Sequence, residues 1–117
     1  KLLLPLKRFL SDEQSKEFLE NYKEVFPELM ATKLSLSTIK HINELSVDNN
    51  LASIQVPVLL GKAIKDKVNS PMEMNFIYEH LTADKKLLEF DCGHYEIYVG
   101  DIFEQAVREQ IAWFANI

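Results

Sequence analysis

The sequence predicts an α/β fold in which parallel strands are joined by a crossover helix and preceded by a helical segment. Two apolar β-type runs, at 56–61 and 86–91, are separated by a segment long enough for a helix. Parallel neighbouring strands require such a crossover, whereas a hairpin requires only a short turn. We therefore divide the chain into a helical segment, 1–50, and an α/β segment, 51–117.

The helical segment is expected to begin with an amphipathic helix. Ser11 and Gln14 have the spacing of a capping box, and Pro27 is expected to close the helix. Apolar residues recur between them with helical period: Phe18, Leu19, Tyr22, Val25 and Phe26. One or two further helices follow, the last capped by Ser37, and the run Asp48-Asn49-Asn50 is typical of a turn.

The first run of the α/β segment is apolar on both faces, as expected for a parallel strand that helices cover, and Pro57 suits the beginning of this strand. The crossover helix has a well-marked start. Ser70 is a capping residue, Pro71 suits the first helical position, and Glu73 lies three residues after the cap. We expect the helix to begin there.

The second strand is expected at 87–90, parallel to the first. Asp101 and Glu104 then have capping-box-like spacing at the start of a final amphipathic helix. Two strands alone leave unpaired edges and a partly covered apolar face. We therefore expect further sheet from an upstream segment, another chain or an oligomer partner.

Composition and charge exclude several classes of protein. Hydrophobic residues make up 47% and charged residues 26% of the 117 residues, which is the mixture of one folded, water-soluble domain or part of one. The net charge of −5 and the scattered basic residues argue against a nucleic-acid partner. The run Leu2-Leu3-Leu4 is far too short for a membrane span. A single cysteine, Cys92, suits a reducing compartment, so we expect a cytoplasmic location.

The order and spacing of residues 54–114 resemble the C-terminal part of the α/β-hydrolase family. The resemblance rests on the strand 54–60, the acid loop 65–71, the strand 86–90, the loop Gly93-His94-Tyr95 and a closing helix with Trp113-Phe114. It implies a partial α/β-hydrolase fold, with residues 11–50 in the place of the helical cap that many members insert over the active site. Ala63 and Cys92 stand where members usually have glycine.

The resemblance implies a catalytic role for two residues. Asp66 matches the triad acid and His94 the general base, whose imidazole the acid orients to accept the nucleophile's proton. Without the family pattern, Asp66 reads as a solvated turn residue between two lysines, and His94 as a structural or exposed loop residue. If the strands are parallel neighbours, both side chains lie at one edge of the sheet.

The nucleophile of such a triad is expected before the acid, on a Gly-x-Ser-x-Gly turn. The sequence contains no such turn, and the segment that would form the oxyanion hole is missing too. We therefore expect the chain, which begins at Lys1, to be a fragment that is inactive alone. It would supply two of three triad members to a serine hydrolase acting on an ester, thioester or related acyl bond of a small-molecule substrate.

Two alternatives stay open: a non-catalytic hydrolase-like binding or interaction module, and an unrelated small α/β binding domain that completes its sheet by oligomerising. Cys92 is expected to be a buried, inert thiol, and His41 and His80 to lie on helix surfaces. Four large side chains are most simply core and helix-face residues: Met72, Met74, Trp113 and Phe114. No histidine or carboxylate cluster has metal-ligand spacing, and we expect no cofactor.

Overall fold

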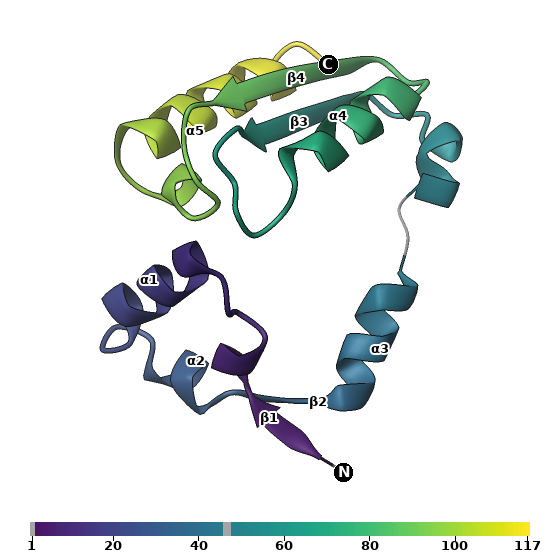
Figure 1. Cartoon of the computed structure of the whole chain (residues 1–117). Coiled ribbons are helices and arrows are strands. Elements are labelled where there is room, and N and C mark those ends of the chain that lie inside the picture. The colour runs from purple at the N-terminus through teal and green to yellow at the C-terminus, as the bar shows by residue number, and fades with distance from the viewer. Residues whose placement is uncertain (1, 46–47) are drawn as a thin grey trace. The chain divides into compact units, whose positions relative to one another are not determined.

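The computed structural model of the protein describes residues 2–45 and 48–117. The chain divides into two compact units, Lys1–Ser46 and Val47–Ile117. The described residues form helices together with a small antiparallel sheet and a small parallel sheet (Figure 1). The fold class is thus mixed α/β, in agreement with the prediction.

The first unit combines helices with a short antiparallel ribbon that the sequence did not predict. Strands β1 (Leu3–Pro5) and β2 (Lys33–Ser35) pair with Leu4 opposite Leu34. Three residues are too few to display the alternating pattern by which a strand is recognised. The helices of this unit are a 3-10 turn (Leu6–Arg8), α1 (Glu13–Tyr22), α2 (Pro27–Ala31) and α3 (Leu36–Glu44).

Helix α1 is capped by a different residue from the one expected. The Asp12 carboxylate accepts a hydrogen bond from the Ser15 backbone N–H at 2.8 Å. Asp12 has an extended backbone, with φ −68° and ψ 164°, so its side chain lies over the first turn. The predicted capping box of Ser11 and Gln14 is therefore wrong by one residue.

Two other boundaries predicted for this unit are also wrong. Pro27 begins α2 and does not end α1, because its fixed φ suits the first helical position, where no N–H is needed. Ser35 takes the N-cap position of α3, and Ser37 lies within the helix, with its Oγ 2.7 Å from the Ser35 Oγ. The ribbon strand β2 leads directly into α3 and thereby sets the start of this helix.

The second unit is a strand-helix-strand arrangement followed by a helix. Its elements are a 3-10 helix (Asp48–Ser53), β3 (Val58–Ala63), α4 (Pro71–His80), β4 (Lys85–Phe90), a 3-10 turn (Glu96–Tyr98) and α5 (Gly100–Phe114). The two strands are parallel, with Val58 opposite Lys85 and Ala63 opposite Phe90. The prediction of parallel neighbouring strands is confirmed, and β3 begins just after Pro57.

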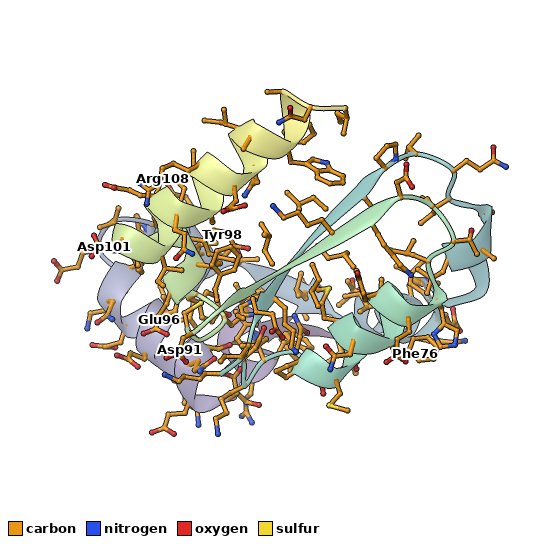
Figure 2. The ribbon with its side chains drawn as sticks, turned by 90° about the horizontal axis from the view of Figure 1, so that it is seen from above. Phe76, Asp91, Glu96, Tyr98, Asp101 and Arg108 are labelled. Atoms are coloured by element: carbon orange, nitrogen blue, oxygen red, sulfur yellow. The ribbon has the colours of Figure 1, made fainter. Side chains whose placement is uncertain are left out.

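Helices α4 and α5 lie on opposite faces of this sheet (Figure 2). On the α4 face, Lys62 of β3 donates a hydrogen bond to Asn75 of α4 at 2.9 Å. The α5 face carries the buried core, which consists of Phe90, Cys92 and Ala106 packed against Ala63, Leu88, Ile97 and Ile102. The start of α4 is as predicted, since Ser70 Oγ accepts a hydrogen bond from the Met72 N–H at 3.3 Å.

The start of α5 differs from the prediction. Gly100 is the first helical residue and has a φ of +62°, which favours glycine, while Val99 occupies the N-cap position. Asp101 lies inside the first turn, and the expected pairing of Asp101 with Glu104 as a capping box is wrong. The sequence pattern located the helix but not its first residue.

The sheet of the second unit is incompletely covered. No residue of β3 is buried, and two side chains expected in packed positions are largely exposed, Met72 by 71% and Phe114 by 67%. Among the described residues, no helix has the length and apolar character needed to cross a bilayer.

Replacement of Asp12 by alanine tests the corrected cap. We expect Asp12→Ala to destabilise α1 by about 1 kcal/mol, because it removes the acceptor of the Ser15 N–H. Ser11→Ala is the matched control and should change stability by much less. Amide hydrogen exchange of α1 measures both effects; a larger loss for Ser11→Ala would restore the original prediction.

Candidate active site

The loops that follow β3 and β4 lie side by side beyond the ends of the strands. The Ile64 N–H donates to the Phe90 carbonyl at 3.0 Å, and the Lys65 N–H donates to the Cys92 carbonyl at 3.0 Å. Both loops leave the carboxyl edge of the sheet, since the strands are parallel and in register. Side chains in the first few residues after β3 and after β4 therefore meet at this edge.

Asp66 and His94 are the two side chains that meet there. The His94 Nδ1 lies 2.8 Å from the Asp66 Oδ2. The pair is largely shielded from water, with 13% of the Asp66 side chain and 24% of the His94 side chain exposed. An ionised carboxylate only accepts hydrogen bonds, so the imidazole Nδ1 donates in this contact. The second ring nitrogen, Nε2, then has an acceptor lone pair while the ring is neutral.

The Asp66 carboxylate is held on its other side by the backbone of its own loop. Its Oδ1 accepts hydrogen bonds from the Val68 N–H at 2.7 Å and the Asn69 N–H at 2.8 Å. An aspartate that binds backbone groups two and three residues ahead forms an Asx-type turn. Because Oδ1 is occupied in this way, Oδ2 is directed at the imidazole.

These contacts determine the charge state of Asp66. Burial alone would raise the pKa of this carboxyl group, but the hydrogen bonds from the Asn69 N–H, His94 and the Val68 N–H outweigh burial. The pKa of Asp66 therefore lies below its ordinary value. The carboxylate is ionised at neutral pH and is available to accept the hydrogen bond from His94.

A pocket of about 190 Å³ opens beside the pair. Asp66 and His94 line it together with apolar side chains of Met74 and Ile97, and Ser70 contributes to its wall. Ser70 caps α4 through its Oγ and lies outside any elbow-like sequence. The pocket gives a small molecule access to the imidazole.

One wall of the pocket carries a charged group. The Lys62 side chain is 12% exposed, and its Nζ lies 2.6 Å from the Glu89 Oε1 and 2.9 Å from the Asn75 Oδ1. Lys62 and Glu89 are paired residues of the two strands. The ion pair thus offsets the lysine charge close to the site and links β3 to β4.

Cys92, His41 and His80 lie where the sequence predicted them. Cys92 is buried, with 2% exposed. Burial is the main cause that raises the pKa of its thiol, and the negative charges of Glu96 and Asp91 raise this pKa further. A buried thiol with a raised pKa is a poor nucleophile. His41 and His80 lie on helices and are exposed.

Several groups at the site were missed from the sequence. The backbone donors of Val68 and Asn69 were not anticipated, although an aspartate that opens a turn is a known signal for such contacts. The Tyr95 and His94 rings lie nearly perpendicular, at 78°, with their centroids 4.7 Å apart. Glu96 accepts a hydrogen bond from the Gly93 N–H, and this contact had no recognisable signal in the sequence.

Within residues 2–45 and 48–117, no group of three or more histidine, cysteine or acidic side chains is arranged to hold a metal ion.

Acid titration tests the environment of Asp66. Because its pKa is lower in the folded chain than in the unfolded chain, ionised Asp66 stabilises the fold above the unfolded value of about 3.9. This contribution is lost as the pH falls through the lower folded-state pKa. We expect urea unfolding to show a steeper loss of stability between pH 5 and pH 2 for the wild-type chain than for Asp66→Asn. Equal slopes would contradict the hydrogen-bonded environment.

Comparison with known proteins gives distant and partial similarity. The chain is 36% identical over 109 residues to two Escherichia coli proteins, each described as an uncharacterized 31.7 kDa protein in the traX-finO intergenic region. It is 30% identical over 91 residues to the quorum-quenching protein AidA of Acinetobacter baumannii (strain MDR-ZJ06). These alignments cover 92% and 78% of the chain. The chain spans 38% of the length of the Escherichia coli relatives and 28% of AidA. No family model and no solved structure matches the chain.

Proposed function

We propose that this chain supplies the acid and the general base of a serine hydrolase that cleaves an ester, thioester or related acyl bond. The observation that carries the proposal is the 2.8 Å contact between the His94 Nδ1 and the Asp66 Oδ2 at the carboxyl edge of two parallel strands. An imidazole oriented by a largely shielded carboxylate, beside a pocket, is the arrangement that activates a hydroxyl nucleophile.

In the proposed reaction, the His94 Nε2 removes the proton of a serine hydroxyl as its oxygen attacks the acyl carbon. The ring is then an imidazolium, and the ionised Asp66 stabilises it through Nδ1 without taking the proton. When the tetrahedral intermediate collapses, the Nε2 proton passes to the leaving group. The lowered pKa of Asp66 favours this role, because a protonated acid would not stabilise the imidazolium.

The proposal assigns the serine and the oxyanion hole to a part of the protein outside these 117 residues, in a complete α/β-hydrolase fold. Three observations support this assignment. The relatives from Escherichia coli are longer, since the chain spans 38% of their length. The residues of β3 are not buried. The pocket of about 190 Å³ is smaller than the roughly 300 Å³ at the lower end for ligand sites.

The name of one relative is compatible with a hydrolase. That relative is named a quorum-quenching protein, AidA. The similarity to AidA extends over 78% of the chain.

We further propose that residues 1–50 serve as a cap over the active site, in keeping with their helices and their position before the acid strand. The proposed location is cytoplasmic, as the reduced and buried Cys92 allows.

Labelling with a fluorophosphonate probe tests the proposal in the full-length protein. The probe reacts with an activated serine nucleophile and not with an ordinary serine hydroxyl. We expect the probe to label the wild-type protein and not to label His94→Ala detectably. In Asp66→Asn, we expect kcat for ester hydrolysis to fall by about 10⁴-fold, as in triads whose acid is replaced by its amide.

Two matched variants complete the experiment. His80→Ala removes an exposed imidazole on α4, and Ser70→Ala removes the pocket hydroxyl that caps α4; both should still be labelled. A folded full-length protein with intact His94 that is not labelled would contradict the proposal and favour a non-catalytic binding module. Loss of labelling in Ser70→Ala would place the nucleophile within this chain and also contradict it.

A further inference from the structure

The peptide group between Cys92 and Gly93 is tied on both sides. Its carbonyl oxygen, from Cys92, accepts a hydrogen bond from the Lys65 N–H at 3.0 Å. Its N–H, from Gly93, donates a hydrogen bond to the Glu96 carboxylate. Cys92 and Gly93 are both buried. This single peptide plane therefore connects the acid loop to the side chain of Glu96.

The Cys92-Gly93 peptide is close in sequence to His94, and its hydrogen-bond partner Lys65 is next to Asp66. Lys65 immediately precedes Asp66, and Gly93 immediately precedes His94. A rotation of the peptide plane would move the Cys92 carbonyl away from Lys65 and redirect the backbone that enters His94. A hydrogen bond from a backbone N–H to a carboxylate is charge-assisted and stronger than one between neutral groups. The contact with Glu96 thus opposes that rotation.

We propose that Glu96 is a positioning residue for the general base: its carboxylate fixes the Cys92-Gly93 peptide, and thereby holds the His94 Nδ1 against the Asp66 Oδ2. Its bearing on catalysis rests on the proposed function, whereas its effect on the His94 contact does not. Glu96 begins the 3-10 turn Glu96–Tyr98, so the turn carries the carboxylate back over the loop that it constrains.

A second link between the two loops is weaker. The Lys65 Nζ lies 2.8 Å from the Asp91 Oδ1, and these side chains are 61% and 68% exposed. Exposed ion pairs contribute little because water and salt screen them. Figure 2 labels Asp91 and Glu96 at the same end of the sheet. Both acids are thus near the loop, but the Glu96 carboxylate binds its backbone directly.

The experiment measures how fast the His94 Nδ1 proton exchanges with water, by NMR on the full-length protein. Glu96→Ala removes the acceptor, Glu96→Asp keeps the charge but shortens the reach, and Glu96→Gln keeps an acceptor oxygen without the charge. We expect exchange to accelerate by about tenfold or more in the Ala and Asp variants and to stay within about threefold of wild type in the Gln variant. Glu104→Ala, which removes an exposed carboxylate of α5 paired with Arg108, should leave the rate unchanged.

The pattern across the variants decides the inference. If Glu96→Asp matches the wild type while Glu96→Gln matches Glu96→Ala, negative charge near the loop is sufficient and the positioning role is wrong. Unchanged exchange in all three variants also overturns it. Should Glu96→Ala unfold, the comparison of the Asp and Gln variants gives the same decision. The readout needs no serine nucleophile, so a failure here is distinct from an absence of fluorophosphonate labelling.

Discussion

The parallel register of β3 and β4 is the constraint on which the site depends. With Ala63 opposite Phe90, the two strands end level with each other, and the loops after them leave the same edge of the sheet. The backbone hydrogen bonds of Ile64 and Lys65 continue this pairing past the strand ends. A shift of register by one residue would move one loop along the other by about 3.3 Å and separate Asp66 from His94.

Charge and hydrogen bonding then give the pair its chemical character. Two backbone N–H groups fix one oxygen of Asp66, and the imidazole of His94 meets the other. Burial opposes ionisation of this carboxyl group, but its hydrogen-bond donors favour ionisation more strongly. The outcome is a negatively charged, fixed acceptor in a shielded position. Such a group orients a neighbouring imidazole without competing for its proton, which is what a general base needs from its partner.

The sequence predicted the second unit better than the first, for physical reasons. Apolar runs and a proline-started helix are strong signals, so the strands, α4 and the meeting of Asp66 with His94 could be anticipated. The β1–β2 ribbon has strands of three residues, too short to show a period. Helix starts were misplaced because several neighbouring polar residues can act as a cap and only backbone geometry selects one, as Asp12 does for α1. The backbone contact of Glu96 leaves no mark in a sequence pattern at all.

The tautomer of His94 is the most direct test of the central contact. Long-range proton-nitrogen NMR correlations at neutral pH distinguish a ring protonated on Nδ1 from one protonated on Nε2. A neutral ring that donates to Asp66 must carry its proton on Nδ1. We expect the Nδ1–H form for His94 and its disappearance in Asp66→Ala. A neutral His94 protonated on Nε2 in the folded wild-type chain would contradict the account.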